Sequence, residues 1–125
     1  MELKYFKLSE FDSPDLPGSG AANMKPEFLQ KLDKAREIAG IPFRINSGFR
    51  TMAHNKALQA RGYKAVSNSP HLGGWAADIH CNSSANRMII VKALLEVGFK
   101  RIGIDDTFIH VDCDPTKDQN LIWVY

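Results

Sequence analysis

The chain has 125 residues, of which 44% are hydrophobic and 24% charged, a composition that predicts one domain (residues 1–125) with a single modest core. Its formal charge of +2 comes without a dense run of Lys or Arg, so neither a nucleic-acid partner nor a membrane surface is indicated. No stretch approaches the roughly 20 apolar residues that span a bilayer, and no secretion signal is recognised, so we expect a protein that is cytoplasmic as synthesised.

The first quarter of the chain predicts an irregular lead-in followed by a helix. Two prolines and two glycines lie among polar residues in 11–24, which is typical of irregular structure. A helix is expected from Pro26 to Gly40, because proline suits the first helical position and glycine the end. The apolar residues at helical spacing between them are Phe28, Leu29, Leu32, Ala35 and Ile38.

The middle of the chain predicts a strand, a helix, a loop and a second strand. Residues 43–46 alternate apolar and polar, and the turn-forming residues 47–51 follow them. Residues 52–60 favour a helix. Residues 63–74 are rich in Ser, Asn, Pro and Gly and should form a loop, whereas 75–81 resemble a strand.

A second long helix is expected after residue 83. Ser83 and Ser84 are both suitable caps, and Gly98 is a suitable end. The stripe expected to face the core consists of Met88, Val91, Leu94 and Leu95.

The last quarter of the chain predicts strands. Residues 99–104 and 108–113 form two short strands joined by a hairpin turn at 105–107, and residues 121–125 form a final strand. Helices combined with a small antiparallel sheet give an α+β fold.

Metal-ligand residue types gather near these strands. His71 ends the glycine-rich loop, Asp78 lies in the following strand, and His110 lies in the second strand of the hairpin. Two imidazoles and one carboxylate are a common ligand set for a catalytic zinc, which keeps its fourth position open for water. Scattered ligand types alone are weak evidence, because a lone His or Asp is more often a surface or hydrogen-bonding residue.

Three motifs in sequence order carry a more specific signal. They are SGFRT (47–51), SPHLGGWAAD (69–78) and FIHVD (108–112). Together they resemble the M15 metallopeptidases, which include D-alanyl-D-alanine carboxypeptidases and phage endolysins, and in particular subfamily A of that family. The resemblance covers most of the chain and implies a zinc site on the sheet.

The resemblance implies a role for individual residues. His71, Asp78 and His110 match the ligands of the zinc ion (Zn2+), and Arg50 matches an arginine that faces the carboxylate of the substrate. Ser69 matches a motif serine near the metal. An arginine suits that task because its planar guanidinium pairs bidentately with a carboxylate.

The general base is left open by the sequence. Better-known branches of the family have an acidic residue three positions before the last zinc histidine, or a histidine two before it, where this chain has Thr107 and Phe108. Asp112 is the first candidate, since alternate residues of a strand share a face and it lies two residues beyond His110. Alternatively, Asp112 orients that histidine. Asp106, in the preceding turn, is the second candidate for the base.

Several other residues favour structural roles. We expect His80 to be exposed or hydrogen-bonded rather than a ligand. Trp75 and Trp123 are expected in the core. Cys81 and Cys113 each follow a proposed ligand by three residues in antiparallel strands, so they are expected to remain free thiols.

The leading hypothesis is a monomeric zinc peptidase that hydrolyses peptidoglycan stem peptides, as a D,D- or L,D-carboxypeptidase or as an endopeptidase. The absence of a recognised secretion signal suits a phage or prophage endolysin that reaches the cell wall after release. The alternative is a catalytically weak or inactive zinc-containing wall-binding or virion module, because a fold does not guarantee activity. A purely structural zinc domain ranks last, since closed structural sites usually have four protein ligands.

Overall fold

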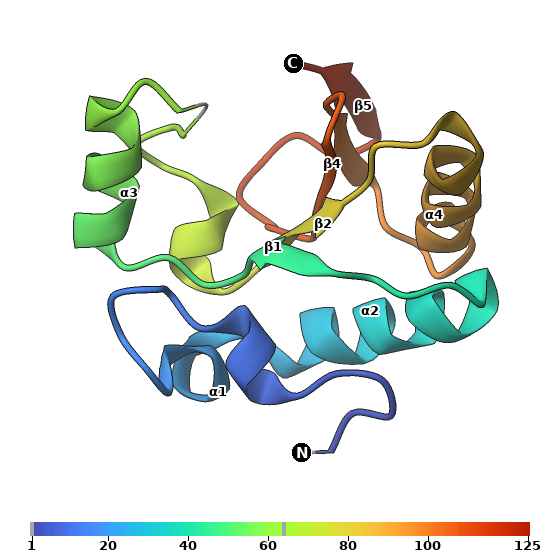
Figure 1. Cartoon of the computed structure of the whole chain (residues 1–125), viewed down its shortest axis with the longest axis horizontal. Coiled ribbons are helices and arrows are strands. Elements are labelled where there is room, and N and C mark those ends of the chain that lie inside the picture. The colour runs from blue at the N-terminus through green and yellow to red at the C-terminus, as the bar shows by residue number, and fades with distance from the viewer. Residues whose placement is uncertain (1, 64) are drawn as a thin grey trace.

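The computed structural model describes residues 2–63 and 65–125 and arranges helices around a five-stranded sheet (Figure 1). The helices are α1 (Ser19–Asn23), α2 (Pro26–Ala39), α3 (Met52–Ala60) and α4 (Ser84–Glu96), with two short 3-10 helices, η1 (Leu8–Phe11) and η2 (Pro70–Gly73). The strands are β1 (Ile45–Ser47), β2 (Ala76–His80), β3 (Arg101–Ile104), β4 (Phe108–Asp112) and β5 (Leu121–Val124). The α+β prediction is confirmed.

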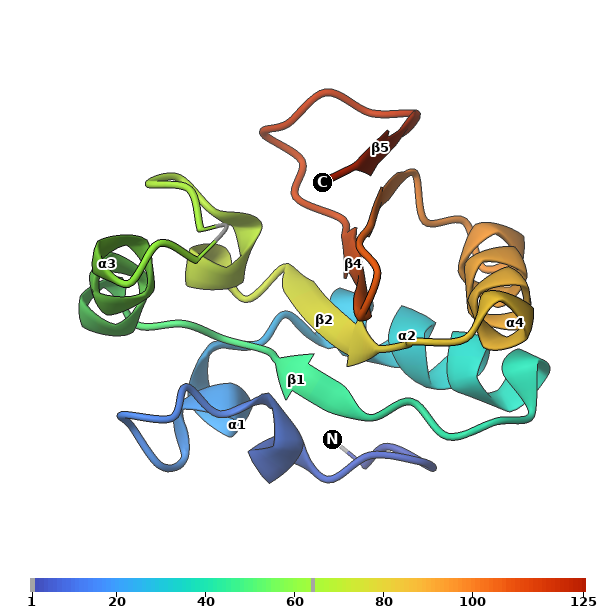
Figure 2. The same cartoon turned by 45° about the horizontal axis from the view of Figure 1, so that its top comes forward.

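The sheet has the strand order β1-β2-β4-β3-β5 and is antiparallel except at one edge, where β5 runs parallel to β3. The parallel pairing departs from the expected all-antiparallel sheet. Asp112 at the end of β4 pairs with Arg101 at the start of β3, and residues 113–120 bring the chain back so that Leu121 also pairs with Arg101. Figure 2 shows this connection arching from β4 to β5.

The two faces of the central strands have different compositions because successive side chains of a strand point to opposite sides. One face packs against α2 and α4 and contains Ile79 of β2, Ile102 of β3 and Ile109 of β4, all fully buried. The opposite face contains Asp78 and His110, which are direct cross-strand partners. The core therefore lies behind the strands that present the candidate ligands.

Most of the expected boundaries agree with the structure. The helix α2 begins at Pro26 and is followed by Gly40, whose φ of 68° is the left-handed conformation that glycine adopts without strain. The hydroxyl of Ser83 accepts a hydrogen bond from the backbone N–H of Asn86, which identifies Ser83 as the cap of α4. The expected irregular lead-in contains a short helix, α1, that its composition did not predict.

The predicted core stripe of α4 is partly wrong. Leu94 is buried as expected, but Met88 is 70% exposed and Leu95 is 48% exposed. The buried face instead includes Ile90 and Ala93. Apolar residues occur around most of this helix, so their spacing alone did not determine which side packs against the core.

The two tryptophans are not in the core, contrary to the sequence-based expectation. Both Trp75 and Trp123 are partly buried, and the ring of Trp123 lies 5.5 Å from that of His110, centroid to centroid. Cys81 and Cys113 are free thiols, as predicted. None of the helices in the described part of the chain is long and apolar enough to cross a membrane.

Candidate metal centre

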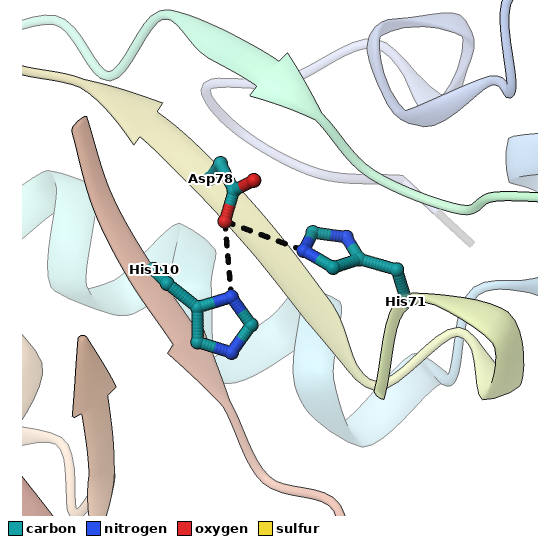
Figure 3. A group of neighbouring side chains, drawn as sticks. All are labelled: His71, Asp78 and His110. Carbon is teal, nitrogen blue, oxygen red and sulfur yellow. Dashed lines mark hydrogen bonds and ion pairs between the residues drawn. The ribbon is translucent and has the colours of Figure 1, made fainter. Parts of the chain in front are cut away.

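His71, Asp78 and His110 converge on one side of the sheet, each offering one ligand atom within 4.8 Å of the others. His71 comes from η2, Asp78 from β2 and His110 from β4 (Figure 3). One carboxylate oxygen, Asp78 Oδ1, lies 3.0 Å from His110 Nδ1 and 3.3 Å from His71 Nε2. All three residues are buried.

His71 is held in place by the two neighbouring motifs. Its Nδ1 lies 2.7 Å from the carbonyl oxygen of Gly48, which can only accept, so this nitrogen carries the proton of the ring. Its carbonyl accepts a hydrogen bond from the backbone N–H of Arg50 at 3.1 Å. Ser69 caps η2, and its hydroxyl accepts from the backbone N–H of His71 at 3.2 Å. Ser69 therefore supports the backbone that carries the histidine.

His110 is oriented by a buried carboxylate. Its Nε2 lies 2.6 Å from Asp112 Oδ2, and the other carboxylate oxygen accepts from Arg101 Nε at 2.7 Å. Asp112 is fully buried. A carboxylate that accepts the outer N–H of a ligand histidine fixes its tautomer and ring orientation. This geometry suits the orienting role that the sequence left as an alternative for Asp112.

The arrangement requires a positive charge between the three residues. Because the outer nitrogens of His71 and His110 donate to Gly48 and Asp112, the inner nitrogens of the neutral rings present lone pairs toward Asp78 Oδ1. Lone pairs facing a carboxylate oxygen repel, so the metal-free protein keeps a second proton on His110 that is shared with Asp78, and a bound metal ion would replace that proton. The residues fit zinc, since neighbouring ligands of a tetrahedral zinc lie about 3.4 Å apart.

The titration behaviour of the metal-free residues reflects the same crowding. Burial alone would lower the pKa of His110, but hydrogen bonds with Asp112 and Asp78 raise it to about 9. Burial lowers the pKa of His71. Burial alone would raise the pKa of Asp78, yet the two histidines hold it well below its usual range. Asp78 is therefore a carboxylate at neutral pH, as a metal ligand must be.

Arg50 lies beside the ligands rather than apart from them. Its Nη2 donates to Asp78 Oδ2 at 3.3 Å, its Nε donates to Ser47 Oγ at 3.1 Å, and its Nη1 donates to Asn55 Oδ1 at 3.4 Å. A guanidinium has five N–H donors, so two are left after these contacts. Arg50 is buried but borders the cavity in front of the ligands.

That cavity has a volume of about 240 Å³, and all three candidate ligand residues line it. Part of its wall comes from the end of the chain, through Lys117, Trp123 and Tyr125. Burial raises the pKa of Tyr125 to about 12, so its phenol stays protonated at neutral pH. Sequence reasoning missed these wall residues, because nothing in their spacing places the last strand beside the ligands.

The remaining candidates, Asp106 and His80, do not line the cavity in front of the ligands. Asp106 is in the exposed turn between β3 and β4, and its carbonyl accepts from Arg87 of α4 at 3.2 Å. Its neighbour Asp105 lines a second cavity, which also borders Arg50 and Asp78. His80 is partly buried and is not a member of the ligand cluster.

The chain belongs to the peptidase M15 family, whose model matches residues 4–112. The match contains His71, Asp78 and His110, and it supports a metallopeptidase. No individual curated protein matches the chain. Residues 113–125 lie beyond the matched region.

Proposed function

We propose that the protein is a zinc-dependent peptidase that hydrolyses peptide bonds in peptidoglycan stem peptides, as a carboxypeptidase or an endopeptidase. The observation that carries the proposal is the convergence of His71, Asp78 and His110 at one cavity, each offering one ligand atom within 4.8 Å of the others. Membership of the M15 family supports the reaction class.

Zinc held by these three residues would supply a bound water of lowered pKa and a Lewis acid for the scissile carbonyl. Gly48 and Asp112 keep the two imidazoles in the tautomers that metal binding needs. Arg50 lines the same cavity, and its two remaining N–H donors are suited to bind a carbonyl or carboxylate oxygen of the substrate. A peptide bond placed between these groups is fixed close to the reacting water.

A second candidate function is a zinc-containing wall-binding module without turnover. It is favoured by one observation: among the described residues that line the cavity, Asp78 has the only side-chain carboxylate. Asp78 is itself a proposed ligand, and Asp112 is buried between His110 and Arg101. A module of this kind would bind stem peptides but lack a carboxylate to carry the proton.

Two measurements on the purified protein test the proposal. Zinc content is determined by elemental analysis, and purified peptidoglycan is digested and analysed by mass spectrometry for new amine and carboxyl termini. We expect one zinc per chain and new termini that disappear when His71, Asp78 or His110 is replaced by alanine. Wild-type protein that holds zinc, binds peptidoglycan and releases no new terminus would favour the binding module.

A further inference from the structure

One cation of the cavity wall has no ionic partner within the described part of the chain. Arg50 pairs with Asp78, and Arg101 pairs with Asp112. Lys117 lines the same cavity and is partly buried, but none of the described ion pairs or side-chain hydrogen bonds involves its ammonium group. The lining therefore carries an uncompensated positive charge at Lys117.

The backbone of Lys117 makes two hydrogen bonds within its own loop. Its N–H donates to the carbonyl of Asp114 at 3.4 Å, and its carbonyl accepts from Gln119 Nε2 at 2.8 Å. The adjacent carbonyl, that of Asp118, accepts from Arg101 Nη1 at 2.6 Å. The same Arg101 donates to Asp112 behind His110, so the loop that carries Lys117 is anchored to the support of the metal centre.

We propose that Lys117 binds a carboxylate of the substrate and makes the protein prefer stem peptides whose carboxylate near the scissile bond is free over the same peptides with that group amidated. The inference rests on the proposed function and specifies its substrate class. A partly buried ammonium without a counter-ion is best compensated by an anionic ligand, and a hydrogen bond to an ionised group is about twice as strong as a neutral one. Arg50 differs from Lys117 in this respect, because its charge is already paired with that of Asp78.

The neighbours of Lys117 suit a peptide with an aliphatic part. Phe108, Trp123 and Tyr125 line the same cavity, and their rings contact one another with centroids 5.2 Å apart for Phe108 and Tyr125 and 6.5 Å for Trp123 and Tyr125. These rings provide apolar surface, whereas Lys117 provides the charge. Two carboxylates of a stem peptide have the required chemistry, the C-terminal one and a side-chain one.

The test uses two matched pairs of synthetic stem peptides with the zinc-loaded protein. One pair differs only by amidation of the C-terminal carboxylate, the other only by amidation of the side-chain carboxylate. In the pair whose amidation removes the carboxylate that Lys117 binds, we expect the wild-type kcat/KM to be about 10-fold higher for the free acid than for the amide. This is the effect expected from the loss of one charge-assisted hydrogen bond. Lys117→Gln should reduce that ratio to near one, Lys117→Arg should retain it, and zinc content should stay unchanged in both variants.

Lys92→Gln provides the matched control, because Lys92 is an exposed lysine of α4 that does not line this cavity. It should keep the wild-type ratio. Calorimetric binding of the same peptides separates the two hypotheses. Lys117-dependent preference in binding without any cleavage would refute the peptidase and support the role of Lys117. Cleavage without preference in either pair, or a preference that survives Lys117→Gln, would overturn the role of Lys117 alone.

Discussion

The outer nitrogen of each candidate ligand histidine has its own acceptor. For His71 the acceptor is a backbone carbonyl, that of Gly48, whereas for His110 it is the side chain of Asp112. Only the second acceptor can be altered by mutation without moving the backbone. A substitution of Asp112 can therefore show whether this residue orients the metal ligand His110 or acts directly in catalysis.

Replacing Asp112 with asparagine should weaken zinc binding by about 10-fold or more, because the charge that stabilises the outer N–H of His110 is lost. The measurement is competition for zinc with a chelator of known affinity. Asp106→Asn serves as the control and should leave zinc affinity unchanged, since Asp106 lies in an exposed turn. If Asp112 were instead the general base, zinc affinity would be kept and turnover would fall by roughly 100-fold or more.

The metal-free protein should depend on pH through His110. Its folded pKa of about 9 lies above its ordinary value of 6.5: burial alone would lower that pKa, but Asp112 and Asp78 raise it. The stabilising effect of its proton is therefore present below pH 6.5 and is lost as the pH rises to about 9. We expect urea denaturation of chelated protein to show a falling free energy of unfolding across this interval.

Zinc-loaded protein is the control for that measurement, because metal binding displaces the proton of His110. Its free energy of unfolding should vary less between pH 6.5 and 9. A metal-free protein with equal stability at both ends of the interval would contradict the assigned network of His110 with Asp78 and Asp112.

The sequence predicted the site residues that lie in recognisable motifs, but not those whose role depends on how distant strands pair. His71, Asp78 and His110 lie in recognisable motifs, and the structure brings them together. Arg101 lies outside these motifs. It contacts Asp112 because the register of β3 and β4 makes the two residues cross-strand partners. Trp123 was expected in the core because a large aromatic usually is, and only strand pairing places it beside His110.

At the scale of elements, the register of four strands places Asp78, His110, Gly103 and Trp123 in one row across the sheet. Gly103 is the only one of these without a side chain, and the indole of Trp123 occupies the space beside it. A Cβ atom at position 103 would lie 2.5 Å from the indole nitrogen, closer than atoms can approach. The glycine thus allows Trp123 to lie against His110.

Gly103→Ala should therefore destabilise the protein by about 1–3 kcal/mol, the usual cost of overpacking, and should displace Trp123 from His110. Urea denaturation measures the first effect and tryptophan fluorescence the second. In a Trp123→Leu background the same substitution should cost clearly less, because the clashing ring is gone. Equal costs in the two backgrounds would mean that the indole is not what excludes a side chain at position 103.

The elements that the sequence predicted best are the helices whose first and last positions are marked by a proline, a capping serine or a glycine. Pro26 and Gly40 bound α2, and Ser83 caps α4, in each case for reasons local to a few residues. The direction of β5 could not be predicted this way, because it depends on how the 113–120 loop returns to Arg101. The buried face of α4 was equally undetermined, since it is set by contacts with α2 and the sheet.

At the scale of the whole molecule, the core and the metal centre lie on opposite faces of the same strands. The hydrophobic core includes α2, α4 and the back of the sheet, and it does not depend on the ligands. Metal removal should therefore lower the stability of the protein without unfolding the chain. The strands β2 and β4 that carry Asp78 and His110 keep their core contacts through Ile79 and Ile109.

We expect zinc at 100 times its dissociation constant to add about 2.7 kcal/mol to the free energy of unfolding, which corresponds to a rise in Tm of roughly 10 °C for a chain of this size. Calorimetry with and without a chelator measures the shift. Far-ultraviolet circular dichroism at about 25 °C should be almost unchanged. Unfolding of the chain on chelation at that temperature would show that the metal, rather than the core, maintains the fold.

The cavity wall and the metal-binding residues belong to different stretches of the chain. The ligands lie within residues 4–112, whereas Lys117, Trp123 and Tyr125 belong to the stretch that follows, which is attached through β5 and Arg101. Selection for new substrates can therefore act on one short stretch while the hydrolytic apparatus stays constant. A combinatorial library confined to the cavity-lining positions Lys117 and Tyr125 would explore substrate range while keeping Trp123 against His110 and the Asp118 carbonyl bonded to Arg101.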